Sequence, residues 1–185
     1  MKGNQIMLSK NMALRPATEN DWLAVAALLE ANKLPFEGAR EHLATYLLAI
    51  SDGEVIGSAG LEVYADIALL RSVAVAPRLH RQGVGKMLVS RLLLEARRRK
   101  IAKVCLLTTN ANKYFAQLGF KYELIEQAAL ALKASAEFQG ACPASAAFMS
   151  LTLEQAPIVE DDLPVSALDT GQIEPAFKAG LSAQG

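Results

Sequence analysis

Residues 71–88 read RSVAVAPRLHRQGVGKML. The apolar run that ends at Pro77 is typical of a buried strand, and apolar side chains recur at helical spacing after Gly85. A glycine-rich turn at the start of a helix presents several backbone N–H groups in one direction, and the helix dipole adds positive potential there. The stretch therefore predicts a strand, an anion-binding loop and a helix, in an arrangement suited to a pyrophosphate.

Two common phosphate-binding motifs are absent from this stretch. The dinucleotide fingerprint of the Rossmann fold needs a third glycine and an opening strand, and here the loop follows several earlier strands. A Walker loop needs four residues between its glycines and then Gly-Lys-Ser/Thr, whereas Gly83 and Gly85 are separated by Val84 alone. The loop therefore predicts neither of these two nucleotide-binding folds.

Upstream of this stretch the patterns predict strands and helices in alternation. Asp52-Gly53 is the pair that a tight primed turn requires between two strands. Thr18 and Asp21 form a near capping box at the start of a helix. The predicted elements are an edge strand at 13–17, helices at 22–32 and 37–43, and an antiparallel meander of strands at 46–50, 54–61 and 67–75.

Downstream, a buried strand at 104–107 follows the helix, so the crossover brings it parallel to the strand at 67–75. The remaining predicted elements are a short helix that Gly119 ends, a strand after it, a helix at 128–138 and a closing strand at 147–153. The expected fold is α/β (α+β), with one mixed sheet of six to seven strands and helices on both faces. We expect a disordered extension at 1–11, one domain at 12–154 and a flexible tail at 155–185.

Composition excludes several classes of protein. The 185 residues are 52% hydrophobic, and 19 Lys and Arg balance 19 Asp and Glu, so no electrostatic footprint for nucleic acid or an anionic membrane is present. Cys105 and Cys142 are too few for a disulfide framework or a metal site. No apolar run approaches the ~20 residues of a membrane span. We therefore expect no metal, no nucleic acid, no membrane and a cytoplasmic location with free thiols.

The loop and two later segments resemble the GCN5-related N-acetyltransferase (GNAT) superfamily. The matching residues are Val73-Ala74-Val75-Ala76-Pro77, Gly83-Val84-Gly85-Lys86-Met87-Leu88, and Tyr114-Phe115 with Leu118-Gly119-Phe120. The resemblance runs from about residue 12 to 153. It implies that acetyl-CoA is the cosubstrate and that the acetyl group passes to an amine.

The resemblance also implies the cosubstrate-binding residues. The pyrophosphate is expected on the backbone N–H groups of Arg81, Gln82, Gly83, Val84, Gly85 and Lys86, and the pantetheine arm beside Val73, Ala74 and Val75. His80 stands where the superfamily usually has Arg or Gln. Asn110, after the strand at 104–107, is expected either to contact pantetheine or acceptor or to cap the next helix.

A second departure concerns the proton donor to the departing thiolate. Relatives of this superfamily carry a tyrosine five residues before the phenylalanine that Phe120 matches, and here that position is Phe115. Tyr114 is the remaining candidate for this role. One residue is ~100° of rotation around a helix, so its hydroxyl is expected to point elsewhere. A thiol with a pKa of ~8.5 can leave without a strong acid.

Other segments resemble narrower groups within the superfamily. Residues 60–64, 68–72, 106–109 and 142–146 together are similar to a subgroup named for arsenic-resistance operons. Residues 106–109 with the aromatic pair are similar to the acetyltransferase domain of N-acetylglutamate synthases. Both resemblances imply a small, amino-acid-like acceptor.

Two charged residues interrupt the apolar meander and are candidates for the acceptor site. Arg71 could clamp an anionic group of the acceptor, with Glu62 taking the amine proton, or the two could pair with each other inside the protein. Strand alternation places Arg71, Val73 and Val75 on one face and Ser72 on the other. Leu34-Pro35-Phe36-Glu37 is expected to line the acceptor site, and Cys142 is a candidate contact.

The sequence thus predicts an N-acetyltransferase acting by direct attack of an amine in a ternary complex, because no Ser or Cys has an adjacent base for a covalent acetyl-enzyme. Three alternatives stay open. Two are other functions, namely a non-catalytic regulator that binds acetyl-CoA and an enzyme that acetylates proteins or peptides. The third concerns assembly, since the protein could form a homodimer.

Overall fold

A computed structural model describes residues 12–153, so the expectations for residues 1–11 and 154–185 lie outside the described residues. Seven strands form one mixed sheet in the order β1-β2-β3-β4-β5-β7-β6. Their bounds are β1 Met12–Pro16, β2 Tyr46–Ser51, β3 Glu54–Tyr64, β4 Ile67–Val75, β5 Lys103–Thr108, β6 Lys121–Tyr122 and β7 Ala147–Thr152. The α/β fold class and the mixed sheet expected from the sequence are confirmed.

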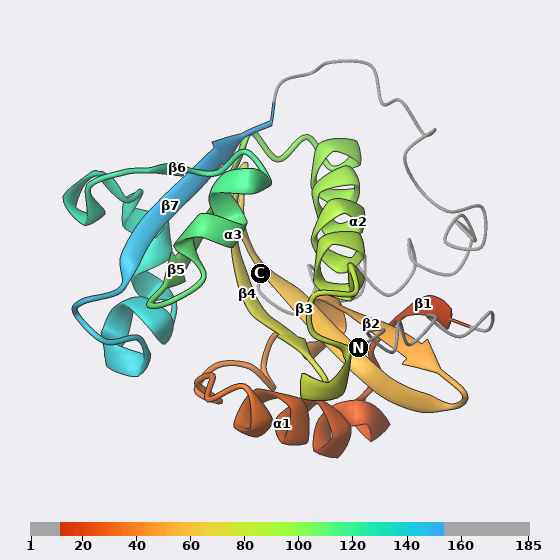
Figure 1. The fold of residues 1–185 in the computed structure, drawn as a ribbon. Coiled ribbons are helices and arrows are strands. Elements are labelled where there is room, and N and C mark those ends of the chain that lie inside the picture. Colours follow the sequence, from red (N-terminus) through yellow and green to blue (C-terminus); the bar gives the residue numbers. More distant parts are fainter. Residues whose placement is uncertain (1–11, 154–185) are drawn as a thin grey trace, which may run out of the picture.

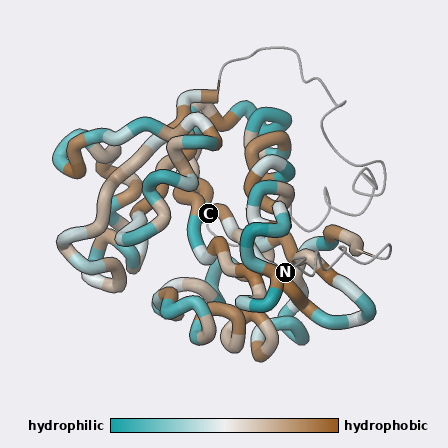
Figure 2. Tube along the Cα trace, in the orientation of Figure 1, coloured by the Kyte–Doolittle hydropathy of each residue, from teal (hydrophilic) through white to brown (hydrophobic). Residues whose placement is uncertain are grey.

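The longer helices cover opposite faces of the sheet (Figure 1). Helix α2 (Val84–Arg98) packs Leu88 and Leu92 into one hydrophobic cluster, and α1 (Trp22–Ala31) packs Val25 and Leu29 into another. Neighbouring residues of the sheet alternate between the two clusters, as the two-residue period of a strand requires. Figure 2 shows apolar and polar residues alternating along α2, the pattern of a helix with one buried face. No helix within residues 12–153 is long and apolar enough to cross a membrane.

The sheet opens between β4 and β5. These strands run parallel, as the crossover predicts, but they pair only from Ile67 to Leu69 with Lys103 to Cys105. Beyond Leu69 and Cys105 the two strands continue but no longer pair with each other. Opening a sheet at its parallel pair leaves the carboxyl ends of two strands free to border a ligand site.

A β-bulge interrupts β4 beside this opening. Between the pairs Ser58–Ala74 and Gly60–Arg71, β3 contributes one residue and β4 contributes two. Ser72 takes a left-handed conformation with a φ of 55°, which is uncommon for a residue with a side chain. The bulge breaks the two-residue alternation. The Ser72 hydroxyl bonds Arg71 Nε and the Tyr46 hydroxyl on the α1 side, while Val73 packs on the α2 side, so the prediction that Arg71 shares a face with Val73 and opposes Ser72 is wrong. A bulge re-aims side chains in this way because it inserts one residue into the pleat.

Two predicted helices are absent. Residues 37–43 form successive turns that lead into a 3₁₀ helix at Leu43–Thr45, because Gly38 has a φ of 73° and Arg71 donates a hydrogen bond to the Glu37 carbonyl. The segment predicted as a helix at 128–138 folds into a 3₁₀ turn at Leu130–Ala134 and a wide turn at Glu137–Ala141. In both segments tertiary contacts override the local helical pattern. The short helix α3 (Asn112–Gln117) is present as expected.

The N-terminal strand is joined to α1 by a charged capping cluster. The Asp21 carboxylate accepts hydrogen bonds from both Arg15 terminal nitrogens, at 2.8 and 2.7 Å, and from the backbone N–H and hydroxyl of Thr18. The capping box expected from Thr18 and Asp21 is confirmed. The Arg15 guanidinium holds the pKa of Asp21 well below its usual value.

Asp21→Asn should lower the free energy of unfolding at pH 7 by roughly 1–3 kcal/mol, because it weakens charge-assisted hydrogen bonds. Since the native pKa of Asp21 is lowered, its stabilisation is complete above the unfolded value of about 4 and is lost as the pH falls through the native value. Urea unfolding at a series of pH values checks this. If the difference in free energy of unfolding between variant and wild type stayed constant as the pH fell, the explanation would be contradicted.

Candidate active site

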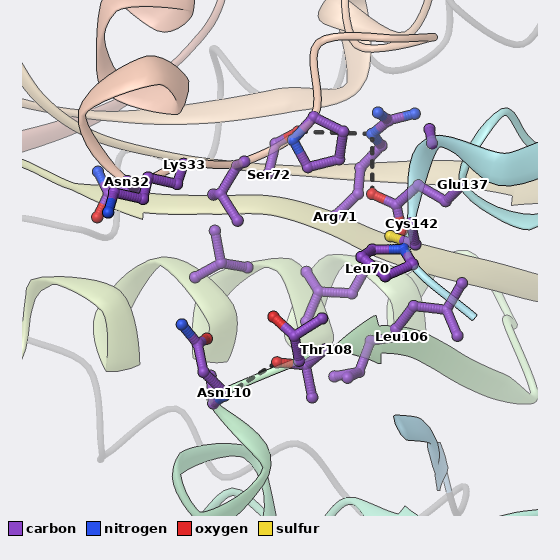
Figure 3. Close-up of a pocket in the computed structure, with 18 of the residues that line it drawn as sticks. Asn32, Lys33, Leu70, Arg71, Ser72, Leu106, Thr108, Asn110, Glu137 and Cys142 are labelled. Carbon is purple, nitrogen blue, oxygen red and sulfur yellow. Dashed lines mark hydrogen bonds and ion pairs between the residues drawn. The ribbon is translucent and has the colours of Figure 1, made fainter. Parts of the chain in front are cut away.

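A cavity of about 770 Å³ lies at the opening between β4 and β5. Four parts of the chain border it in Figure 3: the loop after α1, the bulged part of β4, the end of β5 and the segment before β7. Leu34-Pro35-Phe36-Glu37, which we expect to line the acceptor site, borders this cavity. The polar lining residues are Asn32, Lys33, Glu37, Arg71, Ser72, His80, Thr108, Thr109, Asn110, Tyr114, Glu137 and Cys142.

Arg71 is the most highly connected side chain of the wall. Its guanidinium is fully buried and forms an ion pair with Glu62. It donates a hydrogen bond to the Glu37 carbonyl at 2.6 Å and one to the Ser72 hydroxyl at 3.4 Å, and its Nε lies 3.6 Å from Glu137 Oε1. All three guanidinium nitrogens therefore have partners inside the protein, and a direct clamp on an acceptor would require one of them to change partner.

Glu62 does not line the cavity. Its side chain is fully buried, one carboxylate oxygen pairs with Arg71, and the other accepts a hydrogen bond from the Tyr64 hydroxyl at 2.6 Å and lies 3.6 Å from His42 Nε2. The predicted internal pair of Arg71 and Glu62 is confirmed. The prediction that Glu62 accepts the amine proton does not fit this placement, because strong internal partners occupy both oxygens.

Glu137 is a cavity residue that sequence reasoning missed. It lies in the wide turn before β7, its side chain is 6% exposed, and it borders the cavity beside Cys142. Burial raises its pKa to about 7; the Arg71 charge opposes this shift and the Glu62 charge adds to it. Nothing in residues 128–138 distinguished this glutamate from a solvent-facing residue of a helix, since its burial depends on a turn that local pattern does not predict.

The cysteines have different environments. Cys105 is buried in the core, as expected, and Cys142 borders the cavity. Burial, together with the nearby Glu137 carboxylate, raises the pKa of the Cys142 thiol to about 12. The thiolate is the reactive form of cysteine, so Cys142 is a poor nucleophile at neutral pH.

The loop before α2 has the backbone expected of an anion site. Gly83 takes a φ of 87° at the N-cap, a conformation for which glycine is the favoured residue. The first turn of a helix leaves its N–H groups without carbonyl partners inside the helix, here those of Val84, Gly85 and Lys86. A Cβ atom on Gly85 would lie 3.1 Å from the Tyr114 hydroxyl, so the glycine keeps a narrow space open between α2 and α3.

Most of the predicted cosubstrate residues lie beside the cavity rather than in its wall. Val73 and Asn110 border it, whereas Ala74 is buried and packs toward α1. Val75 and the loop of Arg81, Gln82, Gly83, Val84, Gly85 and Lys86 do not border it. Asn110 is not a helix cap, because α3 has Ala111 at its N-cap and the Ala111 N–H donates to Thr108 Oγ1.

Tyr114 lies at the junction of cavity and loop. Both Tyr114 and Phe115 border the cavity, and their rings pack edge to face at 5.0 Å. Phe115 extends into the core against Phe120, while the Tyr114 hydroxyl reaches the space beside Gly85. The Tyr114 hydroxyl therefore lies beside the glycine loop rather than in the solvent. This hydroxyl is buried without a hydrogen-bond partner among the described residues, and burial raises its pKa to about 12, so it retains its proton.

His80 links two edges of the site. Its Nε2 lies 2.9 Å from the Val75 carbonyl and 3.2 Å from Asn32 Oδ1, and Asn32 also donates to the Val75 carbonyl at 3.1 Å. The imidazole thus ties the loop before α2 to the end of β4 and to the turn after α1. Residues 12–153 contain no group of three metal-ligating side chains.

The comparisons agree with this geometry. Residues 42–122 match the acetyltransferase (GNAT) domain family. An amino-acid acetyltransferase from Neisseria meningitidis serogroup A is 29% identical over 128 residues, which cover 64% of this chain and 29% of that protein. One from Mycobacterium tuberculosis is 31% identical over 118 residues, covering 63% of this chain and 55% of that protein.

The same relationship holds in three dimensions. The structure of N-acetylglutamate synthase from Neisseria gonorrhoeae, complexed with coenzyme A and N-acetyl-glutamate, superposes with a TM-score of 0.67 at 24% identity, over 77% of this chain and 35% of that one. This chain therefore spans about a third of the length of the Neisseria proteins that it matches. Its described part, with a bulged β4 and a glycine loop before α2, has the fold of the acetyltransferase (GNAT) domains that it resembles.

Proposed function

We propose that this domain transfers the acetyl group of acetyl-CoA to the amine of a small, amino-acid-like acceptor. The observation that carries the proposal is the cavity at the opening of β4 and β5, which adjoins the glycine loop through Tyr114. The names of the relatives, amino-acid acetyltransferases, support an acceptor of this class. We place the reaction in the cytoplasm, without metal, nucleic acid or membrane.

The residues of the loop fit acetyl-CoA. The N–H groups of residues 81–86 would hold the pyrophosphate at the N-terminus of α2, where the helix dipole favours anions. Val73, Ala74 and Val75 would border the pantetheine arm, with Asn110 on the opposite side of the opening. The absence of a side chain at Gly85 leaves room for this ligand beside α2. The Tyr114 hydroxyl, which has no partner among the described residues, offers it a hydrogen-bond donor. Bound there, acetyl-CoA supplies a thioester whose acetyl group is open to attack.

The chain's residues favour direct attack by the acceptor amine. Cys142 keeps its proton, so it does not form an acetyl-enzyme. Arg71 acts as a positioning residue, because it joins Glu62, Glu137 and the Glu37 carbonyl at one side of the cavity. The Tyr114 hydroxyl would donate its proton toward the departing sulfur.

Tyr114→Phe tests the role of this hydroxyl. We expect kcat to fall near the low end of the about 10²–10⁴-fold range of general acid catalysis, because a thiolate leaves readily. Affinity for acetyl-CoA should stay within a few-fold, since the ring is retained. Steady-state kinetics and calorimetric titration measure both quantities. Unchanged kcat would show that the thiolate leaves without help from Tyr114.

One second function has an observation in its favour. Phe115 replaces the expected tyrosine and packs in the core, which is compatible with a domain that binds acetyl-CoA without turnover. A CoA-release screen separates the two functions. It would use amino acids, their phosphonate and arsenic analogues, and short peptides, because the sequence also resembles the arsenic-resistance subgroup. Turnover of an amino acid supports the proposal, turnover of peptides alone supports a peptide acetyltransferase, and tight binding without turnover supports the regulator.

A further inference from the structure

Glu137 differs in surroundings from the other glutamates at this site. Glu137 is buried and borders the cavity, whereas Glu62 is buried but does not border it, and Glu37 borders it but is exposed. Its position is fixed locally, since its backbone N–H donates to Ser135 Oγ at 3.2 Å and Gly140 ends the turn with a φ of 112°. It is therefore a buried carboxylate held at the edge of the acceptor space.

The charges around Glu137 do not cancel. Two carboxylates, Glu62 and Glu137, share the single guanidinium of Arg71, and Glu62 holds the close contact while Glu137 lies at 3.6 Å. With all three ionised, the cluster has a net charge of −1, from two negative groups and one positive group. A buried site of this charge favours a cation, and an ammonium group is the cation that an amine acceptor brings.

The two carboxylates also differ in their partners. Glu62 pairs with Arg71 and accepts a hydrogen bond from the Tyr64 hydroxyl. Glu137 has the more distant cation and a buried environment, and its pKa of about 7 lets it gain or lose a proton near neutral pH. A general base works best when its pKa is close to the working pH.

We propose that Glu137 binds the ammonium group of the acceptor and accepts its proton. Glu137 takes one proton from the ammonium, and the freed nitrogen forms the N–C bond to the acetyl carbon as the C–S bond breaks. The sulfur takes the second proton lost by the nitrogen, relayed through the Tyr114 hydroxyl. Glu137 returns its proton to solvent through the cavity. This assignment rests on the proposed function.

Other titrating groups near Glu137 are distinguishable from it. Burial raises the pKa of Tyr46 and of Cys142 to about 12, and burial together with the Glu62 hydrogen bond raises that of Tyr64, so these groups stay protonated at neutral pH. Burial lowers the pKa of His42, against the Glu62 charge. Arg71 and Glu62 form an ion pair. The pH dependence that disappears when Glu137 is replaced is therefore assigned to Glu137.

Glu137→Gln is the variant that tests the assignment. It keeps the shape of the side chain and removes the base, so kcat/KM should fall by about 10²–10³-fold with acetyl-CoA affinity and melting temperature retained. In the wild type kcat/KM should rise with pH through about 7, because the base must be ionised, and this rise should vanish in the variant. Glu126→Gln, on the exposed turn before the cavity segment, is the matched control and should change neither quantity.

A second readout does not depend on turnover. NMR of the isotope-labelled glutamate carboxyl groups, in the protein without substrates, should show one carboxyl that titrates near pH 7 and is missing in Glu137→Gln. Two results would overturn the assignment and leave the proposed function intact. One is turnover by Glu137→Gln at the wild-type rate, and the other is titration of the Glu137 carboxyl in the ordinary acidic range. Absence of wild-type turnover on every amine would overturn both.

Discussion

Gly85→Val should weaken acetyl-CoA binding by at least about a hundredfold, a change of about 2.7 kcal/mol. The new Cβ would lie 3.1 Å from the Tyr114 hydroxyl and 3.6 Å from Val75 Cγ2, so the side chain would fill the space between α2 and α3. It would also stand beside the N–H groups that receive the pyrophosphate. Calorimetric titration with acetyl-CoA measures the loss.

Two controls accompany this variant. Lys86→Ala removes an exposed charge from the same turn, and solvent and salt screen that charge, so its effect should be several-fold at most. The melting temperature of Gly85→Val is measured beside its affinity, because the contact of the new Cβ with the buried Tyr114 hydroxyl can cost about 1–3 kcal/mol of stability while the domain stays folded. Acetyl-CoA binding by Gly85→Val at wild-type affinity would exclude the glycine loop as the binding site.

Glu62→Ala should lower the free energy of unfolding by about 3–5 kcal/mol. It removes one partner of a fully buried ion pair and leaves the Arg71 charge without its closest counter-ion. Because Arg71 also holds the Glu37 carbonyl, the variant should loosen the loop at 34–37 and raise the KM for the acceptor. Urea unfolding and steady-state kinetics measure the two effects.

The matched control for Glu62 is another ion pair of the same chain. Glu54 and Arg78 pair at 2.6 Å, but their side chains are 63% and 55% exposed. Glu54→Ala should therefore change the free energy of unfolding by less than ~1 kcal/mol. Equal losses for Glu54→Ala and Glu62→Ala would show that burial gives the Arg71–Glu62 pair no special importance.

Elements with a strong local signal were predictable from the sequence. The meander follows from the apolar runs and from Asp52-Gly53, whose residues have φ values of 51° and 81°, as a primed turn requires. The glycine loop and α2 follow from Gly83 and the helical repeat after it. The helices predicted at 37–43 and 128–138 are wrong. The conformation of these segments depends on contacts with Arg71 and with the core, which a local pattern does not contain.

The candidate site was predictable only in part. The pairing of Arg71 with Glu62 follows from two charges on adjacent apolar strands. The bulge at Ser72 does not, because it arises from the register of two strands, and it brings Arg71, Ser72 and Val73 to the same cavity. Glu137 comes from a turn about 65 residues later in the chain, so only the fold brings it near Arg71.

The central claim is that the acetyl group passes from acetyl-CoA to the nitrogen of a small acceptor. Its most direct test is incubation of the protein with isotopically labelled acetyl-CoA and amino-acid acceptors, followed by mass spectrometry of the products and measurement of free CoA. The account predicts a labelled N-acetyl amino acid, formed in equal amount to the CoA released and with no label on the protein. Tight binding of acetyl-CoA without a labelled product from any amine would contradict it.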